Sequence, residues 1–113
     1  MTILTELNDL FQLIGLPVET GVFSEKAPDT YAVITPLSDT FAIHADNKPQ
    51  IEVCEFRISL YSKGNYTSMA KEITHLLLAS GFTITERKYI GFEDDTEYHH
   101  WNADVARESY FIK

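Results

Sequence analysis

The sequence predicts an α+β fold in which two helices pack against an antiparallel β-sheet. Three observations support this prediction. Residues 50–62 alternate in polarity with a period of two, which indicates a strand with one buried face. After Lys63 and Gly64 the apolar spacing becomes that of an amphipathic helix. Further alternating segments lie before and after this unit, so the expected order is helix, strand, strand, strand, helix, strand, strand.

The first helix is expected over residues 3–14. Its apolar stripe is formed by Ile3, Leu7, Leu10 and Ile14, with Leu4 and Phe11 beside them. Gly15 can supply a left-handed residue at the helix end, and Pro17 prevents the helix from continuing. Residues 18–30 are expected to be a connection that contains a short extended piece at residues 22–23.

Residues 31–37 form the first clear strand of the expected sheet. Pro36 suits a strand end or an edge position, because proline has no N–H to donate to a neighbouring strand. Ser38 and Asp39 are turn formers, so we expect a turn there before a second strand at residues 41–45.

The long strand at residues 50–62 is expected to form a hairpin with the strand before it, through a loop at residues 46–49. Its buried face is expected to carry Cys54, Phe56, Ile58 and Leu60. We interpret Cys54 as a small buried hydrophobe rather than a reactive thiol. The opposite face carries Glu55 and Arg57.

The second helix is expected over residues 66–80, with Asn65 or Thr67 as its N-cap and Gly81 after its end. Its core stripe is Tyr66, Met69, Ala70, Ile73, Leu76 and Leu77. Two strands then follow at residues 82–90 and 97–112. One face of the last strand is expected to carry Trp101, Ala103, Val105, Arg107, Ser109 and Phe111.

The length of 113 residues fits a single domain over residues 1–113, and a hydrophobic share of 44% is sufficient for a core. The single cysteine excludes an internal disulfide. The N-terminus lacks the pattern of a signal peptide, and no apolar run is long enough to span a membrane. We therefore expect a soluble intracellular protein with no membrane partner.

The net charge of −8 disfavours a protein that binds nucleic acid through its phosphates. The excess of acidic over basic residues is greatest in residues 1–45, which contain six acidic residues and a single cation. Two interpretations of this acidity stay open. It can serve ordinary solubility, or it can form a functional acidic surface.

Motifs for catalysis or metal binding occur only in fragments. His99 and His100 are adjacent on an expected strand, so their side chains point to opposite faces. The acidic run at residues 93–97 lacks the spacing of a calcium loop. Cys54 lies in the most apolar part of its strand, which disfavours a catalytic Cys–His pair. We therefore expect no catalytic residue, no cofactor and no metal, and we place the histidines on a sheet face or at a subunit contact.

The last two strands are rich in aromatic residues. Their large rings belong to Tyr89, Tyr98, Trp101 and Tyr110. Such rings can fill a core, or they can anchor a partner chain. The sequence leaves this choice open.

Together these patterns resemble the small tail-completion and tail-terminator proteins of long-tailed bacteriophages and prophages, the lambda-type tail terminator group. The resemblance covers about residues 3–113. It is carried by the short N-terminal helix and then by the segments APDTYAVITPLSD, IEVCEFRISLYSKGNYTSMAKEITHLLLASGF and GFEDDTEYHHWNADVARESYF. The shared features are a proline-preceded strand, an acidic turn, a charged strand that enters a helix with a Gly-aromatic end, and a second acidic turn.

The resemblance implies a non-enzymatic structural protein of the virion tail, present in the host cytoplasm during assembly. Such proteins form a ring that caps the tail tube and offers a surface to the head. The implied partners are further copies of the chain (about six in a ring), the tail-tube protein and the head-completion protein. DNA would only pass through the lumen. A ring of this size would carry a formal charge of about −48, which would repel phosphates.

We expect the acidic lumen to be lined by Glu19, Glu25, Asp29 and Asp39. The candidate subunit contacts are Asp46, Asn47 and Lys48 in the hairpin loop, with Glu55 and Arg57 on the long strand. Sheet edges offer unpaired backbone groups that a neighbouring copy can complete. The alternative is a cytoplasmic, non-enzymatic adaptor with a ferredoxin-like sheet. An enzyme is a third hypothesis, but no sequence motif gathers the groups it would need.

Overall fold

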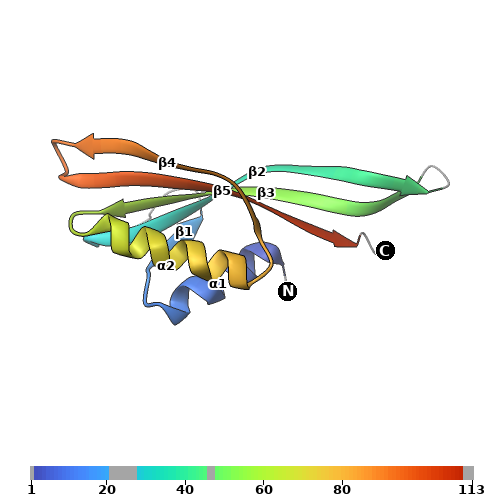
Figure 1. Cartoon of the computed structure of the whole chain (residues 1–113), viewed down its shortest axis with the longest axis horizontal. Coiled ribbons are helices and arrows are strands. Elements are labelled where there is room, and N and C mark those ends of the chain that lie inside the picture. Colours follow the sequence, from blue (N-terminus) through green and yellow to red (C-terminus); the bar gives the residue numbers. More distant parts are fainter. Residues whose placement is uncertain (1, 21–27, 46–47, 111–113) are drawn as a thin grey trace.

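The computed structural model describes residues 2–20, 28–45 and 48–110. In chain order the elements are α1 (Ile3–Leu13), β1 (Val18–Thr20), β2 (Thr30–Ala45), β3 (Lys48–Ser62), α2 (Tyr66–Ala79), β4 (Thr83–Glu93) and β5 (Tyr98–Tyr110). The strands form one five-stranded sheet in the order β1-β2-β3-β5-β4. Both helices lie on the same face of this sheet (Figure 1). The predicted α+β fold is confirmed, and the predicted order of elements agrees roughly with the observed one.

The sheet is mixed rather than wholly antiparallel. The pairs β2–β3, β3–β5 and β5–β4 are antiparallel, whereas β1 runs parallel to β2. Two features hold β1 beside β2. The N–H of Ala32 donates to the carbonyl oxygen of Pro17 at 2.9 Å, and Leu16 is buried in the core. The short strand after the first helix is thus at Val18–Thr20, while residues 22–23 lie outside the described residues.

The expected turn at Ser38 and Asp39 is wrong, because β2 continues through these residues as one strand. The pairing with β3 shifts register between Pro36 and Ser38, which marks a β-bulge. The bulge accommodates the proline, and Ser38 and Asp39 then pair with Glu55 and Cys54 of β3. The long β3 ladder therefore overrides the local turn preference. The two strands expected at residues 31–37 and 41–45 are one.

The helix ends follow the predicted chemistry. Asn65 caps α2, since its side-chain oxygen accepts a hydrogen bond from the Ser68 N–H at 3.3 Å. Thr2 caps α1 in the same way. Gly15 and Gly81 follow the two helices with φ of +68° and +86°, a conformation that other residues adopt only at a cost.

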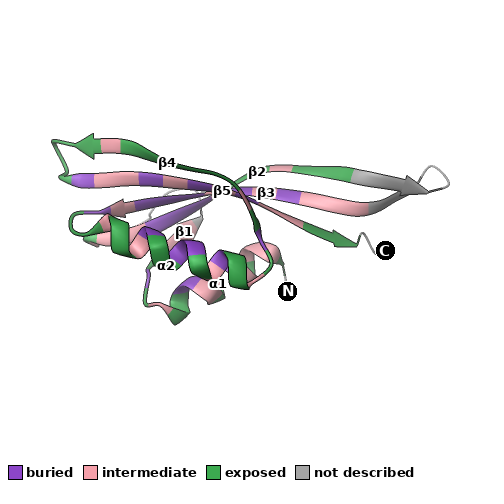
Figure 2. Cartoon of the chain, in the orientation of Figure 1, coloured by how far each residue is buried: buried purple, intermediate pink, exposed green. Residues whose placement is uncertain are grey.

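The core fills the space between the helices and the sheet. Its largest fully buried apolar side chains are Leu7, Phe11, Leu16, Ile34, Ile58, Leu60, Ile73, Leu77 and Val105. The predicted apolar face of β3 is confirmed, because all four of its central side chains from Cys54 to Leu60 are buried. On β5 the buried residues Trp101, Ala103 and Val105 also lie on the expected face. Figure 2 shows the buried positions concentrated where the helices cover the strands.

The molecule is elongated, with extents of 54 × 24 × 24 Å. The β2–β3 and β4–β5 hairpins extend beyond the helices toward opposite ends of the long axis (Figure 1). Strands β3 and β4 run parallel with β5 between them, and α2 connects them, which makes one split βαβ unit.

Candidate functional site

The helix-free face of the sheet carries an ion pair at its centre. Arg57 on β3 lies opposite Asp104 on β5, and its guanidinium donates two hydrogen bonds to the carboxylate, at 2.9 and 3.1 Å. The Asp104 carboxylate raises the pKa of Arg57 above its usual value. Arg57 is therefore a link between two strands, although 43% of its side chain stays accessible to a partner.

Glu55, the other expected contact residue on this face, is also engaged within the chain. The Ser38 hydroxyl donates to its carboxylate at 2.5 Å, across the bulge in β2. Of the expected contact loop, Asp46 and Asn47 lie outside the described residues. Lys48 begins β3, where it pairs with Ala45. The role of these residues in subunit contact stays a prediction.

One end of the helix-free face is aromatic. Tyr31 stacks on Tyr61 with ring centroids 5.0 Å apart, and the Tyr98 ring meets both edge-on. The Tyr98 hydroxyl donates to the carbonyl oxygen of Pro28 at 2.6 Å, which ties the segment before β2 to β5. Burial raises the pKa of Tyr31 and of Tyr61. These rings hold three strands together.

The aromatic residues of the last two strands fall into two groups, one buried and one exposed. Tyr98 and Trp101 are buried, as a core role requires. Tyr89 and Tyr110 are exposed, as a partner contact requires.

Two polar atoms on the helix-free face are buried without a well-placed partner. They are the Nε2 atom of His100 and the Oδ1 atom of Asn102, which have no hydrogen bond within the described part of the chain. Burial lowers the pKa of His100, while the Asn102 amide and the Glu93 carboxylate act in the opposite direction. Burial therefore disfavours the charged imidazole in the folded protein.

The residues expected to line an acidic lumen do not form one surface. Glu19 pairs with Val33 on the helix-free face, whereas Asp39 pairs with Cys54, whose side chain faces the helices. Asp29 is exposed before β2, and Glu25 lies outside the described residues. An acidic lumen stays a prediction, and Glu19 and Asp39 cannot contribute to it from the same face.

Asp39 instead joins a cluster that the sequence did not reveal. The carboxylates of Asp39 and Glu52 and the thiol of Cys54 lie within 4.8 Å of one another. Divalent metals take donor atoms of these kinds. Burial, followed by the hydrogen bond with Asp39, raises the pKa of Cys54 to about 12. The thiol is therefore protonated at neutral pH and is a poor nucleophile, as expected for a buried cysteine.

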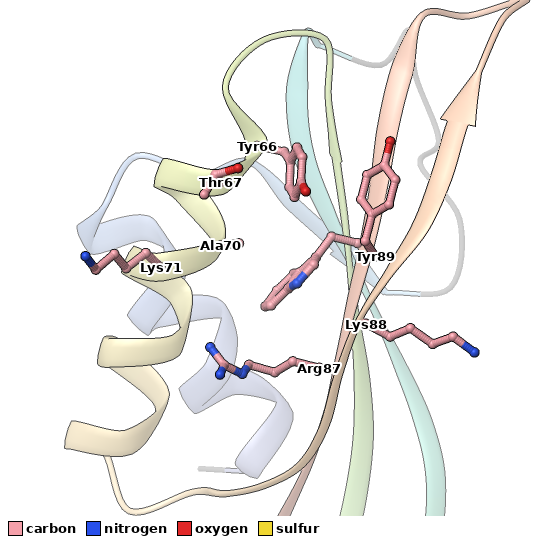
Figure 3. Close-up of a pocket in the computed structure, with 8 residues that line it drawn as sticks. Tyr66, Thr67, Ala70, Lys71, Arg87, Lys88 and Tyr89 are labelled. Atoms are coloured by element: carbon pink, nitrogen blue, oxygen red, sulfur yellow. The ribbon is translucent and has the colours of Figure 1, made fainter.

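A groove lies between α2 and β4, which we call the α2–β4 groove. It has a volume of about 410 Å³ and is lined by Tyr66, Thr67, Ala70, Lys71, Arg87, Lys88, Tyr89 and Trp101. Arg87 points across the groove toward α2, while Lys71 and Lys88 extend outward on its two sides (Figure 3). The Arg87 guanidinium has one long contact, 3.5 Å to the Thr74 hydroxyl. The sequence concealed this groove, because no pattern predicts how closely α2 approaches β4.

Aromatic rings connect the groove to the end of the hairpin. The Tyr66 ring stacks on Tyr89 at 5.0 Å and on His99 at 5.4 Å. The Tyr89 hydroxyl and His99 Nδ1 are hydrogen-bonded at 3.0 Å, and Phe92 packs on His99 at 4.9 Å. Tyr89 and Phe92 are nevertheless 43% and 49% exposed. Exposed rings of this size mark an interaction surface when they lie together.

The turn between β4 and β5 carries four acidic residues, which we call the acidic tip: Glu93, Asp94, Asp95 and Glu97. The turn is exposed, as expected, and narrower than predicted, because β4 extends to Glu93. The Thr96 hydroxyl donates to the Glu93 carboxylate at 2.9 Å, and the Glu97 N–H donates to the Glu93 carbonyl oxygen at 2.7 Å. These bonds fix the shape of the tip.

No protein-family model matches the chain, and no curated protein is significantly similar to it. Neither of the described helices has the length and hydropathy to cross a bilayer.

Proposed function

We propose that this protein is a structural component of a phage or prophage tail, which closes the tail tube as a ring and helps to join tail and head. One observation carries the proposal: within the described residues, the elongated sheet ends on each side in a strand whose outer side is largely open. β4 is an edge strand along its whole length. On the other side, β1 covers only Ala32–Ile34 of β2, and no strand in the described part of the chain pairs with the outer side of residues 35–40.

Two different edges on one molecule allow head-to-tail association. A contact between unlike surfaces of identical copies produces a closed ring when the rotation between copies closes, and an open filament when it does not. Backbone N–H and C=O groups on the outer side of an edge strand can supply the hydrogen bonds for such a contact. The resemblance to tail-completion and tail-terminator proteins supports the ring as the closed form.

The proposed partners follow from the place of the ring at the end of the tail tube. One rim of the ring would contact the tail-tube protein, and the other would face the head-completion protein. The net charge of −8 per chain disfavours tight binding to DNA phosphates, so the genome would pass through without adhering.

Deletion of the gene from the phage or prophage that carries it tests this proposal. Electron microscopy should then show filled heads detached from normal or overlong tails, and a plasmid copy should restore complete particles. Complete particles in the deletion strain would contradict a tail-joining role.

A ferredoxin-like adaptor is the less well supported candidate. A ferredoxin-like sheet contains two split βαβ units, whereas the described residues contain one. An adaptor also gives no reason for a sheet whose two sides are largely open within the described residues.

A further inference from the structure

We propose that the α2–β4 groove binds the acidic tip of a second copy of this chain. The inference rests on the proposed ring, because it names the surfaces by which neighbouring copies would meet. Three observations support this contact: the charges of the two sites, their exposed aromatic surface and the distance between them.

The charges of the two sites are complementary. The chain has nine lysines and arginines against seventeen acidic residues, yet three of the nine line the groove. Only Arg87 points across the groove, whereas Lys71 extends outward from α2 and Lys88 extends outward from β4, beside Asn102 of the helix-free face (Figure 3). None of the three forms an ion pair within the described residues. The acidic tip places four carboxylates on one exposed turn. Electrostatic complementarity of this kind sets partner choice and orientation.

The groove also offers apolar surface. Buried Trp101 lines it from the sheet, and the rings of Tyr66 and Tyr89 stack beside it. Phe92, which precedes the acidic tip, is itself half exposed. Tryptophan, tyrosine and arginine are the residue types that dominate the binding energy of protein interfaces. A tip that docks with its neighbouring Phe92 would remove both exposed aromatic surfaces from water.

A chain cannot fill its own groove with its own tip. Along β4, Tyr89 lies four residues before Glu93, which corresponds to about 13 Å of extended strand, and Asp95 lies beyond the end of that strand. The groove between α2 and β4 and the acidic tip are thus separate surfaces of the molecule. A contact between them joins unlike surfaces of two copies, which is the kind that builds a ring.

Charge reversal tests the contact in purified protein. One variant reverses the groove with Lys71→Glu and Arg87→Glu, and the other reverses the tip with Asp94→Lys and Asp95→Lys. All four side chains are exposed, so circular dichroism should show both variants folded. In sedimentation velocity at low salt, each variant should self-associate at least about tenfold more weakly than the wild type. An equimolar mixture should associate again, because each reversed site then meets a complementary one.

Two controls sharpen this test. Glu72→Lys reverses an exposed charge on α2 that does not line the groove, and it should leave association unchanged. In a Cys54→Ser background, Thr67→Cys in the groove and Thr96→Cys in the tip should form a mixed disulfide between two copies. Glu72→Cys should not form one with Thr96→Cys. Wild-type protein that stays monomeric, reversed variants that associate normally, or a mixture that fails to recover would each overturn the inference.

The outcome is separable from the proposed function. Reversed variants that restore complete particles to the deletion strain would exclude this contact and leave the tail role intact. A deletion strain that makes complete particles would exclude the tail role whatever the purified protein does.

Discussion

The two faces of the sheet are built from the same strands but by different interactions. On the helix-covered face, β3 contributes Ile58 and Leu60 to the apolar core. On the helix-free face, β3 contributes Arg57, which is paired with Asp104, and Tyr61, which stacks on Tyr31. The first face stabilises the fold by removing apolar surface from water. The second aligns neighbouring strands through directional contacts, which are individually weaker in water.

The largest expected effect comes from the helix-covered face. Leu60→Ala should lower the free energy of unfolding by about 2–5 kcal/mol, because it leaves a cavity at a fully buried position. Urea denaturation measures this change. Leu78→Ala is the matched control, since Leu78 is 56% exposed on α2 and should cost less than about 1 kcal/mol. Equal losses for both variants would contradict the division between the faces.

The ion pair on the helix-free face should have a smaller effect. A double-mutant cycle of Arg57→Ala and Asp104→Ala should give a coupling energy of about 0.5–1 kcal/mol, because the bidentate geometry is favourable but the pair is partly solvated. The coupling should decrease in high salt. A coupling energy larger than the loss of stability in Leu60→Ala would contradict the expected difference between the two faces.

The turn between β4 and β5 belongs to neither face. Its contribution to stability should depend on backbone strain. Glu97 has φ of +63°, a conformation that glycine adopts without penalty. Glu97→Gly should therefore raise the free energy of unfolding by about 0.5–1 kcal/mol, less the entropy that glycine loses on folding. Glu97→Ala removes the same charge but keeps the strain, so it should give no gain. Equal stability of the two variants would show that the turn carries no strain.

The smallest expected effect is a pH dependence from the helix-free face. The folded pKa of His100 lies below its ordinary value of 6.5, so the unfolded chain binds more protons as the pH falls. Stability should therefore be greater at about pH 7.5 and decrease as the pH falls through the folded pKa. His100→Gln should reduce this slope. An unchanged slope in His100→Gln would exclude a buried neutral imidazole.

The helix-covered face was largely predictable from the sequence. A period of two in β3 and a period of 3.6 in α2 identify buried side chains without any knowledge of their partners. The capping by Asn65 and Gly81 is equally local.

The errors arose where a distant partner decides the local structure. Ser38 and Asp39 have turn chemistry, but pairing with β3 across a bulge keeps them in a strand. The cluster of Asp39, Glu52 and Cys54 follows from that register and was missed with it. The α2–β4 groove could not be predicted for the same reason, because Arg87 and Tyr66 come to line one groove only in the folded chain.

We propose that copies of this chain form a ring at the end of a tail tube. A cryo-electron microscopy map of the head–tail junction, from the particle whose genome encodes the chain, tests this proposal. The map should show a closed ring of this fold, with the acidic tip of each copy in the α2–β4 groove of the next. A junction that contains no copy of the chain would contradict it.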